Sequence, residues 1–193
     1  LISKSPSLLV MRAYLYSFRW EIGRMIQATR QAIALIDKND PSESTQILLA
    51  LTGVLEGSAY YDSNQYDQVI SNNGRVLSEL PVQWQYARGI AASYIGMGMH
   101  AAGRPEAAQQ FLSGQYESYR DKGDSYALRL LMAVAINHIQ SGNYENAERT
   151  AHTILRQADQ SRLPVMKGWG YYLLGFLNYE WNELKKAADY FEQ

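Results

Sequence analysis

The stretch YYLLGFLNYEWNELKKAADYF, residues 171–191, decides the fold of this chain. It predicts a helix, a tight turn and a second helix, and the sequence ends two residues after Phe191. Whether this helix hairpin is unique or one of several copies determines the architecture, because repeated hairpins stack into an extended array.

Four earlier stretches align with the turn of this hairpin, which makes it one copy of an internal repeat. They are SGNYENAERTAHTIL at 141–155, AGRPEAAQQFL at 102–112, SNQYDQVISNN at 63–73 and RWEIGRMIQAT at 19–29. In every copy a small residue in the first helix is followed, twelve positions later, by a mostly small or compact residue in the second helix. Small residues let antiparallel helices approach closely where they cross. These structural repeat positions are Ala13/Met25, Gly57/Val69, Gly96/Ala108, Ala135/Ala147 and Gly175/Ala187.

The repeat predicts an all-α fold, an α-solenoid or superhelix of about five antiparallel helix hairpins. The steps between copies are 44, 39, 39 and 40 residues, and no strand pattern is seen. We expect one repeat domain over residues 1–193, with repeats at about 6–37, 42–80, 83–121, 124–160 and 165–193. The predicted helices are 6–18, 21–37, 42–62, 65–79, 83–101, 105–121, 124–140, 144–159, 165–180 and 183–193.

Residues with special backbone preferences mark the ends of these helices. Gly103 and Gly142 lie where a helix C-cap needs left-handed backbone. The string Asp40-Pro41-Ser42-Glu43 predicts an N-cap aspartate, a first-position proline and a capping-box glutamate. The string LPV, at 80–82 and again at 163–165, and the string DKGD at 121–124 separate successive hairpins.

The last repeat is aromatic on every side, whereas a natural solenoid closes with a polar capping repeat. Phe191 falls where the second helix needs a large apolar residue, close to the end of the sequence. We therefore expect this chain to be a piece excised from a longer protein.

Composition and charge exclude several classes of protein. Hydrophobic residues make up 47% of the chain and charged residues 19%, so the chain is globular rather than disordered. A net charge of −1 gives no basic excess for direct contact with nucleic acid. The absence of cysteine excludes a disulfide framework and a thiolate metal site, and it fits a cytoplasmic protein. No apolar run of about 18 residues occurs, so we expect no membrane span.

No catalytic or cofactor motif stands out in the sequence. The three histidines, His100, His138 and His152, form neither an i, i+4 pair nor a carboxylate–histidine metal spacing, so packing or surface roles are expected. Gly96-Met-Gly98 falls inside a predicted helix, and the phosphate-binding motif G-x-x-x-x-G-K-[ST] is absent. We expect no enzyme activity, no metal site and no cofactor in this chain.

The small-residue pairs, the turn glycines and the twelve-residue offset resemble the tetratricopeptide repeat, although the period of 39–45 residues exceeds its usual length of about 34. Three stretches, at 5–36, 78–108 and 161–193, are similar to the central region of MalT-like, ATP-dependent transcriptional regulators of the LuxR class. The third, SRLPVMKGWGYYLLGFLNYEWNELKKAADYFEQ, is the most specific. The resemblance implies a parent protein that binds ATP and DNA through modules outside this chain, while the chain itself receives a signal.

In tetratricopeptide-like arrays the first helices line a concave groove, and this geometry assigns a set of predicted groove residues. They are Tyr61, Met97, His100, Arg129, Met132, Trp169, Tyr172, Phe176 and Tyr179. An aromatic, methionine-rich strip suits sugar rings or apolar peptide side chains, and its arginine suits a carboxylate or phosphate. The alternative is that these rings only fill the gaps between hairpins.

These patterns favour a non-catalytic signal-sensing or interaction domain of a bacterial transcriptional regulator. Its partner would be a protein or a small-molecule inducer bound in the groove, and a second copy of the chain is a further candidate. The alternative is a generic tetratricopeptide-type scaffold that holds proteins together and senses no signal.

Overall fold

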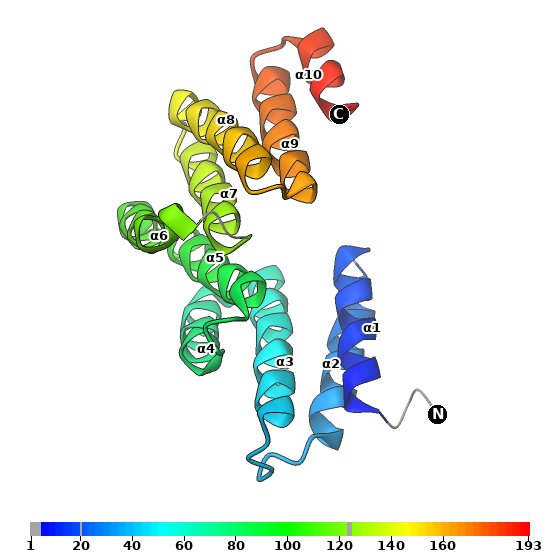
Figure 1. Cartoon of the computed structure of the whole chain (residues 1–193). Helices are drawn as coiled ribbons and strands as arrows, with labels where there is room; N and C mark the ends of the chain where they lie inside the picture. The colour runs from blue at the N-terminus through cyan, green and yellow to red at the C-terminus, as the bar shows by residue number, and fades with distance from the viewer. Residues whose placement is uncertain (1–4, 20, 123–124) are drawn as a thin grey trace. The chain divides into compact units, whose positions relative to one another are not determined.

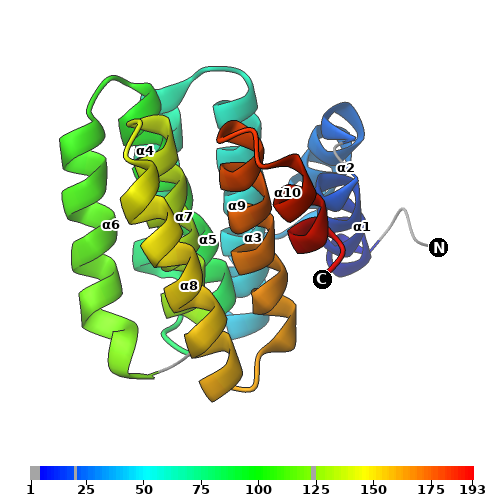
Figure 2. The same ribbon diagram turned by 90° about the horizontal axis from the view of Figure 1, so that it is seen from above.

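The computed structural model describes residues 5–19, 21–122 and 125–193, which form ten α-helices and contain no strand (Figures 1 and 2). Each helix end lies within two residues of its predicted position, although Asp124, the predicted start of the seventh helix, is outside the described residues. The prediction of an all-α solenoid of helix hairpins is therefore confirmed. The helices are α1 (Pro6–Phe18), α2 (Ile22–Leu35), α3 (Glu43–Asp62), α4 (Tyr66–Glu79), α5 (Gln85–Ala101), α6 (Pro105–Tyr119), α7 (Ser125–Gln140), α8 (Tyr144–Gln160), α9 (Pro164–Glu180) and α10 (Leu184–Phe191).

The chain divides into two compact units, Leu1–Gly98 and Met99–Gln193, and the division falls inside α5. The first unit holds α1 to α4 and most of α5, whereas the second holds the end of α5 and α6 to α10. Within each unit, consecutive helices pack as hairpins, such as α1 with α2 and α7 with α8 (Figure 1). Because solenoid repeats contact only their neighbours, a single array can also divide in this way. The single repeat domain over residues 1–193 therefore stays a prediction.

The turns inside the hairpins share one backbone conformation, in which one residue is left-handed. This residue recurs once in each repeat, as the small residues do. The N–H that follows the left-handed residue donates to a carbonyl five positions earlier, as from Arg104 to Met99 at 2.9 Å. The predicted left-handed glycines are confirmed, and asparagine, which tolerates this conformation, takes their place in two turns. The matching position of the first hairpin, residue 20, lies outside the described residues. The left-handed residues of these four turns, with φ of 58, 76, 72 and 61°, are Asn64, Gly103, Gly142 and Asn182.

All ten structural repeat positions are buried. At two of the glycines, however, the nearest neighbour is the residue sixteen positions later, rather than the predicted partner at twelve. A Cβ on Gly57 would clash with the side chain of Asn73, and a Cβ on Gly175 would lie 2.6 Å from the ring of Phe191. The predicted partner Val69 is buried one helical turn closer to the connecting loop. The small residue thus makes room for a larger side chain of the second helix.

Three alanines of the second helices occupy the predicted partner positions. Ala187 is not among the neighbours closest to Gly175, and Ala135 shares its core cluster with Ala151 rather than with Ala147. Direct pairing at twelve positions therefore stays a prediction for Ala147 and Ala187.

The three alanines lie in the first turn of their helices. Each is the fourth residue of its helix and is buried. Each N–H donates to the carbonyl of the residue before the helix, at 3.0, 3.1 and 3.0 Å, which is the first backbone hydrogen bond of the helix. A small side chain here lets the two helices lie close together beside the turn. These residues are Ala108 on α6, Ala147 on α8 and Ala187 on α10.

Each unit has an apolar core between successive helices. In the second unit, alanines and leucines of α7 and α8 enclose Ile154, which is fully buried, and α9 adds Met166 and Leu173. In the first unit, Val54 of α3 packs with Val76 of α4 and Ile90 of α5. Stacking of neighbouring hairpins on these shared cores is how a repeat protein buries its apolar faces.

The start of α3 corrects the predicted cap. Ser42, not Asp40, is the N-cap residue, because its hydroxyl accepts from the Thr45 N–H at 3.4 Å and the helix begins at Glu43. Asp40 instead accepts from the Thr45 hydroxyl at 2.7 Å and from the N–H and hydroxyl of Ser42 at 2.9 and 2.8 Å. These hydrogen bonds, that from Thr45 first, lower the pKa of Asp40. The aspartate therefore organises the loop before the helix and leaves Pro41 outside it.

Candidate functional site

Six of the predicted groove residues lie on α7 and α9 of the second unit, and we call this set the α7–α9 patch. The two helices contact each other within the unit. On α9 the patch residues recur every three to four positions, so they share one face of the helix. The patch consists of Arg129, Met132, Trp169, Tyr172, Phe176 and Tyr179.

The centre of the α7–α9 patch is a stacked cation and ring. The Arg129 guanidinium lies 4.6 Å from the ring centre of Trp169, so a residue of α7 covers a residue of α9. The same guanidinium is 3.8 Å from the sulfur of Met132. Trp169 and Met132 are half-buried and also pack against the core of the unit. This part of the patch is therefore ordered by packing and still reaches the surface.

The aromatic residues further along α9 are more exposed. Tyr172 is 53% exposed and its ring centre lies 6.2 Å from that of Phe191, while Tyr179 is 60% exposed. Phe176 is half-buried between them in the sequence. Large apolar side chains that stay exposed in a cluster are typical of interfaces. The α7–α9 patch thus combines an anchored cation with rings that a ligand or partner can cover.

The predicted groove residues of the first unit have a different environment. Tyr61 is half-buried, and its ring contacts those of Tyr66 and Tyr94 at 5.8 and 5.9 Å. The Tyr94 hydroxyl donates to the Ser58 hydroxyl at 3.0 Å. Met97, on α5, is half-buried. In this unit the predicted position Tyr61 belongs to a tyrosine cluster on α3 to α5, which the sequence analysis did not identify.

A second missed feature is the tyrosine of α1 beside this cluster. Burial raises the pKa of Tyr14, and the neighbouring Tyr86 and Tyr94 raise it further. The Tyr14 hydroxyl donates to the Leu51 carbonyl at 3.4 Å. The phenol therefore stays protonated and acts as a hydrogen-bond donor rather than as a base.

His100, the ninth predicted groove residue, belongs to a polar chain within the second unit. Its Nδ1 lies 2.7 Å from the Asn137 side-chain oxygen, and the Asn137 amide donates to the Gln109 oxygen at 2.8 Å. Because the Asn137 oxygen must accept, His100 carries its proton on Nδ1. The Gln109 amide in turn donates toward His138 Nε2 at 3.5 Å, so that nitrogen is unprotonated. A buried asparagine within the apolar run LLMAVAINHI was the sequence signal for this series of hydrogen-bonded side chains.

We expect His138 to make the stability of the chain depend on pH. Burial, and then the positive charge of Arg149, lower the pKa of His138 below its usual 6.5. The unfolded chain therefore binds a proton before the folded chain does, so stability is full above about pH 6.5 and falls as the pH drops below it. Urea unfolding between about pH 5 and 8 measures this slope. A His138→Gln variant should have a smaller slope, and an unchanged slope would contradict the assignment.

The described residues contain no group of three or more His, Asp or Glu side chains that could hold a metal ion. In the same residues, no helix has the length and apolar character that a bilayer crossing requires.

Comparison with known proteins supports the fold. No protein-family model matches this chain, and no curated protein sequence matches it. A solved structure that does match is the apo form of RapI, a helical tetratricopeptide-like regulator of Bacillus, with a TM-score of 0.61 and 12% sequence identity. The match covers 97% of this chain and 80% of RapI. At this identity the likeness shows the fold alone, a helical repeat of the tetratricopeptide type.

Proposed function

We propose that this chain is a non-catalytic signal-sensing domain of a bacterial transcriptional regulator of the MalT-like LuxR class. It binds a small inducer or a protein partner at the α7–α9 patch. The regulator assignment rests on the three similar stretches at 5–36, 78–108 and 161–193. The binding role rests on one observation, the Arg129 guanidinium held over Trp169 on the helix that also carries the exposed side chains of Tyr172 and Tyr179.

The chemistry of the α7–α9 patch determines what it can bind. Aromatic faces stack on sugar rings and on apolar side chains, and a guanidinium pairs with carboxylate or phosphate oxygens. A ligand that carries both an apolar ring or chain and an acidic group satisfies both kinds of contact. A ligand that binds one arrangement of the repeats more tightly than another shifts the equilibrium toward that arrangement. This shift would change the oligomeric state of the parent regulator.

The second candidate function is a protein-interaction scaffold without a sensing role. It is favoured by the exposure of Tyr172 and Tyr179, because exposed aromatic side chains suit a peptide as well as a small molecule. The two functions differ in whether a small molecule alone binds the chain.

Thermal unfolding of the chain against a panel of sugars, amino acids, nucleotides and other metabolites tests the sensing role. A ligand at about 100 times its dissociation constant adds about 2.7 kcal/mol to the free energy of unfolding. We expect this gain in the wild-type chain and its loss in Arg129→Glu and Tyr172→Ala. A ligand whose gain survives both substitutions binds elsewhere and would refute the role of the α7–α9 patch.

The matched control is Arg156→Glu, which makes the same change of charge on α8. Arg156 is exposed, donates to the Thr153 hydroxyl at 3.3 Å and is not a patch residue. The Arg156→Glu variant should bind the ligand as the wild-type chain does. Two results together would favour the scaffold. No compound of the panel would raise the free energy of unfolding, and a purified protein partner would bind the wild-type chain but not Arg129→Glu.

A further inference from the structure

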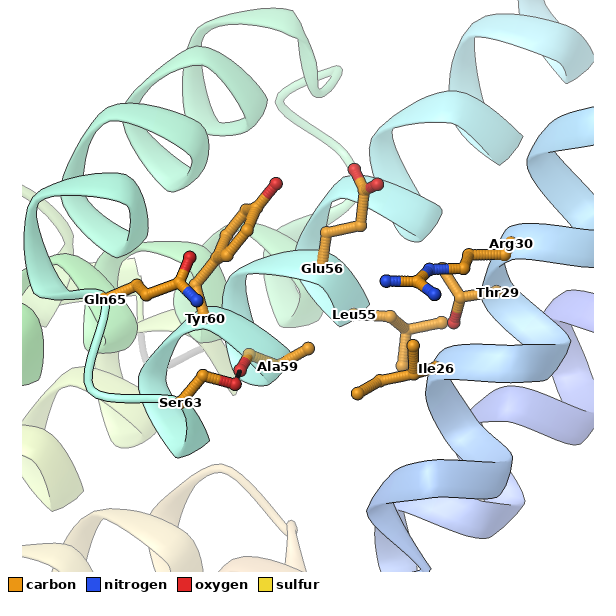
Figure 3. A pocket seen from close by; sticks show the side chains of 9 residues that line it. All are labelled: Ile26, Thr29, Arg30, Leu55, Glu56, Ala59, Tyr60, Ser63 and Gln65. Carbon is orange, nitrogen blue, oxygen red and sulfur yellow. Dashed lines mark hydrogen bonds between the residues drawn. The ribbon is translucent and has the colours of Figure 1, made fainter.

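A pocket of about 140 Å³ lies between α2 and α3 in the first unit (Figure 3). None of its lining residues belongs to the predicted groove or to the α7–α9 patch. The volume is close to that of a cavity that holds benzene, on the order of 150 Å³, so the pocket accommodates a small molecule. The lining residues are Ile26, Thr29, Arg30, Leu55, Glu56, Ala59, Tyr60, Ser63 and Gln65.

Two opposite charges project toward this pocket from facing helices. Glu56 on α3 and Arg30 on α2 both line the pocket, and Figure 3 shows the Arg30 guanidinium directed toward α3 and the Glu56 carboxylate extended upward in the view. Within the described part of the chain, neither side chain makes a hydrogen bond or an ion pair. The two charges are thus near enough to attract each other but do not form an ion pair.

Glu56 is the more unusual of the two charges because it is half-buried. Burial raises the pKa of Glu56, and Arg75, Lys38 and Arg30 oppose this shift. Arg75 already donates to Glu79 at 2.7 Å, and Arg75 and the exposed Lys38 line a neighbouring pocket together with Glu56. A half-buried carboxylate without a partner is costly, and a bound cation or ammonium donor would relieve that cost.

Tyr60 and Gln65 add a hydroxyl and an amide to the lining, and the other uncharged lining groups are apolar or already bonded. Ile26 on α2 and the buried Leu55 on α3 pack together where the two helices meet (Figure 3). The Thr29 hydroxyl donates to the Met25 carbonyl at 2.8 Å, and the Ser63 hydroxyl donates to the Ala59 carbonyl at 2.8 Å. The pocket therefore offers an apolar surface, one acidic and one basic group, and the neutral polar side chains of Tyr60 and Gln65.

From this arrangement we infer that the pocket binds a free α-amino acid with an aliphatic side chain. Its ammonium group pairs with Glu56, its carboxylate pairs with Arg30, and its side chain packs on Ile26 and Leu55. A simple anion would be repelled by Glu56 and a simple cation by Arg30, whereas a zwitterion satisfies both charges. The site is independent of the α7–α9 patch, so either assignment can fail without the other.

Isothermal titration calorimetry of the whole chain with L-leucine and L-valine tests this inference. Saturable binding to the wild-type chain is expected for both amino acids. Isocaproate lacks the amino group of leucine, and isoamylamine lacks its carboxyl group. Each of these analogues should bind the wild-type chain at least about tenfold more weakly than leucine does. The absence of binding of both amino acids at about 10 mM, where a millimolar site is largely filled, would overturn the proposal. Equal binding of leucine and either analogue would also overturn it.

Substitutions locate the binding in the pocket. Glu56→Gln and Arg30→Gln, each with a circular dichroism spectrum like that of the wild-type chain, should weaken leucine binding about tenfold or more. The matched controls are Arg24→Gln on α2 and Glu43→Gln on α3, which are exposed and outside the pocket. Leucine binding that is unchanged in Glu56→Gln and Arg30→Gln would place the amino acid elsewhere and refute the site. Arg129→Glu should leave leucine binding intact.

Discussion

Replacing Tyr126 with alanine is expected to lower the free energy of unfolding by about 3–5 kcal/mol, the usual cost of removing a buried aromatic ring. Tyr126 is fully buried at the start of α7. Its ring centre lies 4.2 Å from that of Tyr119, and its hydroxyl donates to the Gln115 side-chain oxygen at 2.7 Å. Since the ring joins α7 to α6, its removal leaves a cavity between two successive helices. Urea unfolding followed by circular dichroism measures the loss.

A Tyr126→Phe variant separates the ring from its hydroxyl. It keeps the packed ring and loses one hydrogen bond, so the expected cost is only about 1 kcal/mol. Gln115 is half-buried and can turn to water when its donor is removed. If the alanine and phenylalanine variants were equally unstable, the ring would not be a packed element of the second unit.

Substitution of Gly57 by alanine should cost about 1–3 kcal/mol, because the new methyl group overpacks the contact between α3 and α4. The methyl group would clash with the side chain of Asn73. Asn73 is fully buried and its amide donates to the Val69 carbonyl at 2.9 Å, so it cannot move aside freely. Chemical unfolding of the variant gives the cost. Adding Asn73→Ala to Gly57→Ala should recover part of the loss, because it removes the clashing group.

Two other glycines are controls for this prediction. Gly175→Ala should cost less than Gly57→Ala, because its methyl group meets the ring of Phe191, which is 53% exposed and can rotate away. Gly114 is an exposed position inside α6 with open space around it. Gly114→Ala should therefore stabilise the chain by about 0.5–1 kcal/mol. A Gly57→Ala variant as stable as Gly114→Ala would contradict the close approach of the two helices.

The helices and their register could be predicted from the sequence because they depend on local patterns. Small residues recur at fixed steps, and Gly103 and Gly142 mark turns that need left-handed backbone. The turns at Asn64 and Asn182 were predicted, but their left-handed backbone was not, because asparagine is common in other conformations too. The cap of α3 was assigned to Asp40 instead of Ser42, since both residues can cap a helix and only the structure shows which hydroxyl or carboxylate meets the free N–H.

The partner of each small residue was harder to predict than its position. A fixed offset of twelve identifies buried residues such as Ala147 and Ala187, because the offset follows the length of the hairpin. It cannot show which turn of the second helix faces the small residue, since that depends on how the helices cross. At Gly175, for example, the atoms nearest to an added Cβ belong to the ring of Phe191.

The candidate sites depended more on packing between helices than on local pattern. Helical spacing placed Tyr172 and Tyr179 on one face of α9, and both are exposed. Spacing could not predict that Arg129 stacks on Trp169, because that contact joins helices 40 residues apart in the sequence. The pocket of Glu56 was missed for the same reason, since its opposite charge comes from another hairpin. Which groove residues bind a ligand stays a prediction.

The central claim is that ligands bind at the α7–α9 patch, and the fluorescence of Trp169 tests it most directly. The chain has four tryptophans, so a variant that retains only Trp169 reports on this surface alone. The variant is titrated with the panel compound or purified partner that stabilises the chain. Because the Arg129 guanidinium lies 4.6 Å from the ring centre, binding at the patch must change the surroundings of the indole. We predict an emission change that saturates with the dissociation constant found from thermal unfolding; unchanged emission at full saturation would contradict the account.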